Sequence, residues 1–104
     1  MTGSNHRSAF QAFAREAERE LGSSLKKLVL YGSVAKGEAT EESDVDIFAV
    51  VETREQADLL RDIAYRKGLE HGVAMSPVVK TVDEFREIKD TVYGREVLAG
   101  EVYV

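Results

Sequence analysis

The sequence predicts one small domain of the α/β or α+β class. Its 104 residues are enough to enclose a single hydrophobic core. Short apolar segments bounded by glycine and serine, which are typical of strands, alternate with segments whose apolar residues recur at helical spacing. Two T-x-x-Q/E capping boxes mark the starts of helices. Helices and strands that alternate in this way pack as a layered sandwich, so we expect residues 1–104 to form one domain.

Residues 8–21 have the pattern of an amphipathic helix, with charged residues opposite an apolar face. Gly22 follows and can adopt the left-handed conformation that ends many helices. We expect His6, which precedes this segment, to lie in a frayed terminus. The apolar face consists of Phe10, Phe13, Ala14, Ala17 and Leu21.

Three apolar segments predict strands, at residues 25–31, 44–51 and 73–80. The second begins with alternating polar and apolar residues and is then apolar on both faces, which is typical of a strand in the middle of a sheet. Its polar start would open onto a polar site. Pro77 has no amide proton, so we expect the third strand to lie at an edge or to bulge there.

The two capping boxes predict the remaining long helices. The first box, at residues 53–56, begins a helix that we expect to end in the 66–68 region. The second box, at 81–84, begins a helix with Phe85 and Ile88 facing inward. Residues 96–99 are expected to be helical, and residues 102–104 to form a short edge strand. The inward-facing residues expected in the first of these helices are Ala57, Leu60, Ile63 and Ala64.

Composition excludes several classes of function. The chain has no cysteine, which rules out disulfide scaffolds and cysteine-based metal sites and agrees with a cytoplasmic protein. Fourteen Lys and Arg stand against 19 Asp and Glu, a net charge of −5 without any basic block, so we expect no binding to duplex DNA. No apolar run approaches the roughly 20 residues of a membrane-spanning helix, and we expect no secretory signal.

Chemistry-bearing residues concentrate between Tyr31 and Asp46. Gly32 and Ser33 follow a predicted strand and begin a segment that can form a helical turn. Backbone amides at such a turn can cradle phosphate oxygens, and the serine adds a hydroxyl donor. Lys36 could steady phosphates, although an exposed turn lysine is the simpler interpretation.

Asp44 and Asp46 are two residues apart on a predicted strand, so their carboxylates project from the same face. Their Cα atoms should lie about 6.5–7 Å apart, and side chains at this spacing can share one hard cation or bracket two. Magnesium favours a site with one or two carboxylates completed by substrate phosphates. A solvated strand start is the simpler interpretation of the pair, but the Gly32-Ser33 turn at this offset disfavours it.

A Walker A interpretation fails. Gly32 and Gly37 have the correct offset, but Glu38 and Ala39 stand where Lys and Ser or Thr are required.

The segment resembles the G-S-x10-D-x-D signature of the DNA polymerase beta-like nucleotidyltransferase superfamily, from Gly32-Ser33 to Asp44-x-Asp46. The L-Y-G-S-V-A-K-G-E and S-D-V-D runs are similar to the minimal nucleotidyltransferases (MNT) of archaea and bacteria. The resemblance extends from about residue 25 to the C-terminus. It implies a small mixed β-sheet flanked by helices, with Asp44 and Asp46 binding one or two Mg²⁺ ions and Gly32 and Ser33 holding ATP or another nucleoside triphosphate. Lys36 and Ser43 are further candidates for nucleotide binding.

The resemblance also implies an activity and a partner. Members of the superfamily transfer a nucleoside monophosphate to an acceptor hydroxyl and release pyrophosphate. Minimal members act as antitoxins of HEPN-domain proteins, in some cases by adenylylating a tyrosine of the HEPN toxin. We therefore expect a magnesium-dependent transfer, with AMP from ATP as the group transferred.

One departure from the family pattern leaves an alternative open. Active members carry a third carboxylate on a later strand, but residues 73–79 contain no acid. Glu70 or Asp83, a partner or the acceptor would have to supply that group. The alternative is a catalytically degenerate binding module that neutralises a partner by contact. A hetero-complex or a homodimer is compatible with either function.

Other polar and aromatic residues have simpler interpretations. Lys80 could face the nucleotide, but a solvated lysine is favoured. His71 is expected in a helix–strand connection, and Tyr93 and Tyr103 are expected to be packing residues rather than modification targets.

Overall fold

The computed structural model describes residues 2–104, and side chains from residue 5 onward. Its sheet has the strand order β3-β2-β1-β4, with β2 in the middle and parallel to β3. Both β2 and β4 run antiparallel to β1, so the sheet is mixed, as predicted. The elements in chain order are α1 Thr2–Leu21, the 3-10 turn η1 Gly22–Ser24, β1 Leu25–Tyr31, α2 Gly32–Ala35, β2 Asp44–Val51, α3 Arg54–His71, β3 Ala74–Thr81, α4 Val82–Ile88, α5 Val92–Leu98 and β4 Glu101–Val102.

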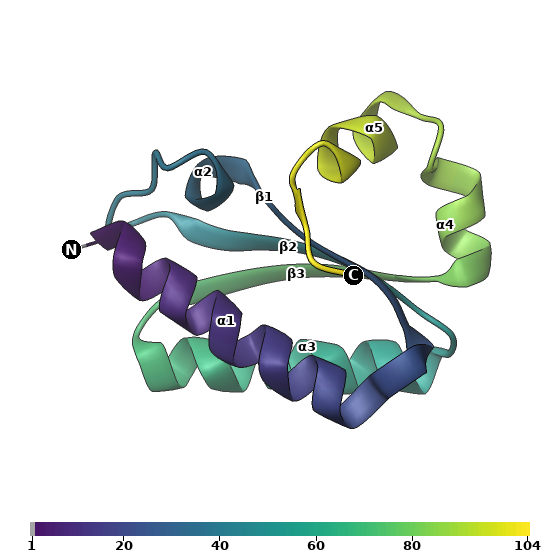
Figure 1. Ribbon diagram of the computed structural model, residues 1–104, viewed down its shortest axis with the longest axis horizontal. Helices are drawn as coiled ribbons and strands as arrows, with labels where there is room; N and C mark the ends of the chain where they lie inside the picture. Colours follow the sequence, from purple (N-terminus) through teal and green to yellow (C-terminus); the bar gives the residue numbers. More distant parts are fainter. Residues whose placement is uncertain (1) are drawn as a thin grey trace.

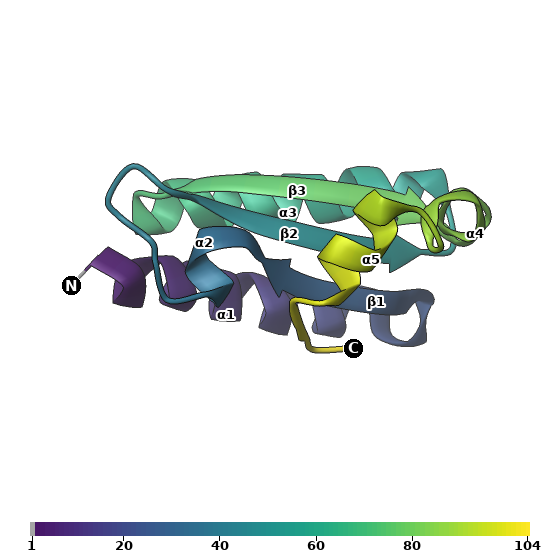
Figure 2. The same cartoon turned by 90° about the horizontal axis from the view of Figure 1, so that it is seen from above.

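Helices cover the two faces of the sheet unequally. The long helices α1 and α3 lie side by side on one face, whereas α4 and α5 lie on the other (Figures 1 and 2). The main core fills the space under α1 and α3 and includes Phe10, Phe13, Leu28, Ile47 and Leu60. A smaller cluster on the other face is built on buried residues Val29, Phe48, Val50 and Val97.

The alternation of β2 explains this division. Its odd-numbered residues Val45, Ile47 and Ala49 belong to the main core, whereas Phe48 and Val50 belong to the smaller cluster. Asp44 and Asp46 are in phase with Phe48, so they project from the face that carries α4 and α5. Neither of these short helices reaches the start of β2, and α2 with the loop that follows it lies at that end instead (Figure 1).

Local signals placed most boundaries correctly. The first two predicted strands match β1 and β2 residue for residue. Both capping boxes are present, with Thr53 and Thr81 as the N-cap residues. The third strand is an edge strand, as Pro77 indicates, and β4 forms the opposite edge.

The strands predicted at residues 73–80 and 102–104 lie at 74–81 and 101–102, and three predicted helix boundaries are wrong by three residues or more. Helix α1 extends to Thr2, so His6 lies within it and is only 2% exposed rather than frayed. Helix α3 continues past residue 68 to His71, because the left-handed cap is supplied by Gly72, with φ 69°. Helix α5 begins at Val92 rather than near Glu96, because the Thr91 hydroxyl accepts a hydrogen bond from the Gly94 amide and caps it.

Within residues 2–104, no helix combines the length and the apolar character that a bilayer crossing requires.

Candidate functional site

The pairing of β1 with β2 brings the two parts of the predicted site together. Tyr31 at the end of β1 lies opposite Asp46 near the start of β2. Helix α2 begins directly after Tyr31, so Gly32 and Ser33 follow the residue that lies opposite Asp46. The twelve-residue separation in sequence therefore becomes direct proximity in the fold.

Gly32 touches the Asp46 side chain. A Cβ atom at position 32 would collide with Asp46 Oδ2 and would lie 3.0 Å from Asp46 Cγ. Gly32 also has φ +76°, a left-handed conformation that other residues adopt only with strain. Only glycine satisfies both conditions, so the glycine of the turn is required by the position of the carboxylate.

The two carboxylates differ in their surroundings. Asp44 is exposed, whereas Asp46 is partly buried. Burial, together with the negative charge of Asp44, raises the pKa of Asp46. Two acidic oxygen donors on one face, with one of them desolvated, form the kind of donor set that a hard divalent cation stabilises.

Ser76 occupies the position on β3 that faces the carboxylates. It pairs with Asp46 in the parallel register, and its hydroxyl donates a hydrogen bond to Asp44 Oδ2 at 2.9 Å. Within the described part of the chain, no group of three or more His, Asp or Glu side chains is arranged to hold a metal ion. A serine thus stands where a third carboxylate on this strand would approach the pair.

Neither Glu70 nor Asp83 replaces that carboxylate. Glu70 lies on α3, which covers the opposite face of the sheet, and it accepts a hydrogen bond from Lys67 Nζ at 3.1 Å. Asp83 lies on α4, which follows the far end of β3, and it pairs with Arg86. The hypothesis that Glu70 or Asp83 supplies the third carboxylate is wrong, because of where these two residues lie in the fold.

The loop between α2 and β2 is held by short-range hydrogen bonds. The Glu38 amide donates to the Ser33 carbonyl at 2.8 Å, and the Thr40 amide donates to Ser43 Oγ at 2.8 Å. Ser43 therefore closes the 40–43 turn with its hydroxyl. Its contact with a nucleotide remains a prediction, as do those of Gly32, Ser33 and Lys36.

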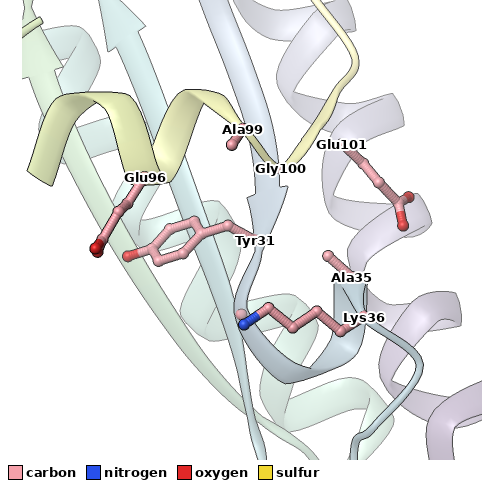
Figure 3. A pocket seen from close by; sticks show the side chains of 8 residues that line it. Tyr31, Ala35, Lys36, Glu96, Ala99, Gly100 and Glu101 are labelled. Atoms are coloured by element: carbon pink, nitrogen blue, oxygen red, sulfur yellow. The ribbon is translucent and has the colours of Figure 1, made fainter. Parts of the chain in front are cut away.

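A pocket of about 660 Å³ lies beside the Gly32 turn (Figure 3). Gly32 and Lys36 border it from the turn, and Glu96 borders it from α5. Figure 3 shows the Tyr31 ring pointing toward Glu96, while the Lys36 side chain extends from the end of α2 across the turn. The pocket is also lined by Ala35, Ala99, Gly100 and Glu101.

Two carboxylates line this pocket, and they differ in their partners. Glu101 accepts hydrogen bonds from Arg7 and from the Tyr103 hydroxyl, and the Arg7 bond lowers the pKa of Glu101 despite the opposing effect of burial. The Glu96 side chain is exposed and has no hydrogen bond or ion pair with any described residue. Glu96 is thus the carboxylate of the pocket that is available to a ligand.

Tyr31 contributes a neutral aromatic wall. Burial, the adjacent Tyr93 and the nearby Asp46 charge together raise its pKa well above the usual range. Its hydroxyl therefore stays protonated at any physiological pH. The sequence identifies Tyr31 only as the end of a strand, because its contact with the pocket depends on where α5 packs.

Lys80 and His71 lie away from the carboxylates. Lys80 pairs with Val50, four residues along β3 from Ser76, so the favoured interpretation as a lysine outside the site agrees with its position. His71 is the last residue of α3, and its Nδ1 lies 3.0 Å from the Lys67 carbonyl. Tyr103 packs on Phe10 with ring centroids 4.8 Å apart, which agrees with a packing role.

Comparison with known proteins identifies the family. The family model of the nucleotidyltransferase domain matches residues 12–98. A Methanocaldococcus jannaschii protein named "Putative protein adenylyltransferase" is 30% identical over 94 residues, which cover 90% of this chain and 92% of that protein. A second protein of that organism with the same description is 31% identical over 64% of this chain and 71% of its own length. The chain therefore belongs to the nucleotidyltransferase domain family and is a transferase enzyme.

Proposed function

We propose that this enzyme transfers AMP from ATP to a hydroxyl group of a protein, with Mg²⁺ bound at Asp44 and Asp46. The observation that supports the proposal most strongly is the contact between Gly32 and the Asp46 carboxylate. It puts a turn suited to phosphate and a pair of carboxylates suited to a cation within one side chain's reach. The name of the Methanocaldococcus jannaschii relatives, which refers to adenylyl transfer to protein, supports the choice of group and acceptor class.

Asp44 and Asp46 fit magnesium by the chemistry of their donor atoms. Both offer carboxylate oxygens on the same face, and the remaining positions around one or two ions would be filled by water and substrate phosphates. Bound magnesium neutralises negative charge on the phosphates and on the leaving pyrophosphate. Ser76 supports this role because its hydrogen bond to Asp44 Oδ2 fixes the exposed member of the pair.

The pocket gives the two substrates distinct places. In this proposal the phosphates lie along the Gly32-Ser33 turn, and the acceptor hydroxyl enters the pocket that Gly32, Lys36 and Glu96 border. The acceptor oxygen attacks the α-phosphorus and forms the new P–O bond. The bond from the α-phosphorus to the bridging oxygen breaks, and pyrophosphate leaves with its electron pair.

The proton of the acceptor hydroxyl goes to Glu96. A general base must reach the hydroxyl that it deprotonates, and Glu96 is the pocket carboxylate that no described residue engages. Glu101 is unsuited to this role because Arg7 and Tyr103 already hold it. This assignment places the base on α5, across the pocket from the Gly32 turn, instead of on β3.

The acceptor we propose is a tyrosine of a HEPN-domain toxin, and the enzyme then acts as its antitoxin. The resemblance of the 31–46 segment to minimal nucleotidyltransferases motivates this choice of partner. The test is intact-mass spectrometry of a HEPN partner co-expressed with the wild-type protein or with Asp46→Asn. We expect the mass of one or more AMP groups on the partner only with the wild type. A partner that is unmodified yet neutralised by both proteins would support the binding-module alternative instead.

A further inference from the structure

We infer that His6 and Arg7, two consecutive residues of α1, are positioning residues that hold the two ends of the active-site segment 32–46. The expected effect on the active site rests on the proposed function, whereas the contacts of His6 and Arg7 do not depend on it. His6 holds the end that leads into Asp44, and Arg7 holds the end that contains the Gly32-Ser33 turn. Both residues reach the segment through its backbone carbonyl oxygens.

His6 secures the carboxylate end. Its side chain is buried, with 2% of the residue exposed, and Nε2 lies 2.8 Å from the carbonyl oxygen of Ser43. A carbonyl oxygen only accepts hydrogen bonds, so Nε2 carries the proton and donates it. Ser43 directly precedes Asp44, and its peptide carbonyl therefore fixes where β2 begins.

Arg7 secures the turn end. Its Nη2 lies 3.4 Å and 3.5 Å from the carbonyl oxygens of Val34 and Ala35, the last two residues of α2. A guanidinium suits this place because carbonyl oxygens at the end of a helix carry partial negative charge. Arg7 is itself held by Glu101 at 3.0 Å and 2.6 Å, a two-point ion pair.

The Arg7–Glu101 pair also connects the turn to the sheet. Glu101 belongs to β4 and pairs with Leu30 of β1, the residue before Tyr31. The Tyr103 hydroxyl donates a further hydrogen bond to Glu101 at 2.9 Å. The guanidinium therefore joins α1, the end of α2 and the C-terminal strand at one point.

The segment needs this support because its own hydrogen bonds are local. Bonds within residues 32–43 join positions three to five apart, and among the described residues only His6 adds a side-chain hydrogen bond to loop 36–43 from outside it. Catalytic geometry has to be held to about 0.5 Å, and a misplacement of about 1 Å can reduce turnover by 10²-fold. The contacts from α1 thus add to the β1–β2 pairing in holding the turn and the carboxylates in place.

The test measures the affinity of the full-length protein for α,β-methylene ATP with Mg²⁺, an analogue that cannot transfer its AMP. We compare His6→Phe, which keeps a ring but removes the donor, with His6→Gln, which restores an N–H donor. Arg7→Gln is compared with Arg66→Gln, because Arg66 also makes a 2.9 Å ion pair that involves α1, through Glu16, but away from the site. Thermal melting of each variant reports the loss of stability separately.

We expect His6→Phe and Arg7→Gln each to weaken analogue binding by about tenfold or more, and His6→Gln to recover most of the loss. Arg66→Gln should bind within about twofold of wild type, even where it lowers the melting temperature as much as Arg7→Gln. Unchanged affinity in both site variants, or an equal loss in Arg66→Gln, would overturn the inference. If His6→Phe does not fold, Arg7→Gln and its control Arg66→Gln keep the inference testable, because they can be compared without it.

The two proposals can fail separately. A wild-type protein that binds the analogue but transfers no AMP to any protein would overturn the proposed function and leave the positioning role standing. A wild type that does not bind the analogue would overturn both.

Discussion

Gly32 and the Asp46 carboxylate are in contact, and a side chain on residue 32 would displace the carboxylate. The left-handed φ of +76° and the collision that a methyl group at position 32 would make with Oδ2 are two separate demands for glycine. Because Asp46 is fixed by its pairing with Tyr31 and Ser76, the turn is located relative to the sheet and not only relative to its own strand.

Substitution of Gly32 can be compared with a matched position. Gly37 has nearly the same φ, +74°, but a Cβ there meets nothing within 4 Å. Both Gly32→Ala and Gly37→Ala should lose about 1–2 kcal/mol of unfolding free energy from backbone strain. Only Gly32→Ala should also lose Mg²⁺–ATP binding, because only its methyl displaces Asp46. Denaturant titration and calorimetry measure the two effects, and equal binding losses would contradict the assignment of the turn.

Neutralising Asp46 should stabilise the protein when no metal is present. Burial raises the pKa of this carboxyl in the folded state, so folding is opposed at neutral pH, where the group must ionise. Asp46→Asn should therefore melt a few degrees higher than wild type at pH 7, and the advantage should vanish below about pH 4, where both forms are neutral. Melting curves at several pH values provide the measurement.

The same variant tests the cation. Added Mg²⁺ should raise the melting temperature of the wild type, because an ion that binds only the folded state stabilises it. Asp46→Asn should show little of this rise. If Mg²⁺ raised the melting temperature of both proteins by the same amount, the ion would bind at a site that does not include Asp46.

Ser76→Asp should install the carboxylate that β3 lacks. A third negative charge beside Asp44 and Asp46 should lower the melting temperature without metal and increase the rise that Mg²⁺ produces. Ser76→Ala is the control, since it removes only the hydrogen bond to Asp44, worth about 1 kcal/mol or less at an exposed site. If the Mg²⁺ response of Ser76→Asp equals that of Ser76→Ala, then Ser76 does not face the cation.

Glu96→Gln should slow AMP transfer without weakening nucleotide binding, because the substitution removes a proton acceptor and keeps the shape of the side chain. General base catalysis contributes about 10²–10⁴-fold, and the rate should fall within that range. Glu87→Gln on α4 is the control, an exposed glutamate outside the pocket. Single-turnover transfer rates measure the effect, and an unchanged rate would exclude Glu96 as the base.

Features that rest on local sequence could be predicted. Strands β1 and β2 are bounded by glycine, serine and acidic residues that end apolar runs, and the capping boxes at Thr53 and Thr81 are complete within four residues. The shared face of Asp44 and Asp46 follows from the two-residue period of a strand. Their proximity to Gly32 was expected only because the spacing resembles a family signature.

Features that rest on contacts between distant segments could not be predicted. The burial of His6 has no signal in the sequence, because its partner, the Ser43 carbonyl, is a backbone atom 37 residues away. Glu96 reaches the pocket only because α5 packs on the face opposite α1 and α3. Ser76 could be located by register once β3 was known to run parallel to β2, and the sequence alone does not specify that direction.

The most direct test of the central claim uses ATP labelled at the α-phosphate or at the γ-phosphate, with a protein acceptor and Mg²⁺. Wild-type protein should transfer α-label and no γ-label, and Asp46→Asn should transfer neither. Transfer of γ-label, or equal transfer of α-label by Asp46→Asn, would contradict an adenylyl transfer that depends on the paired aspartates beside the Gly32-Ser33 turn.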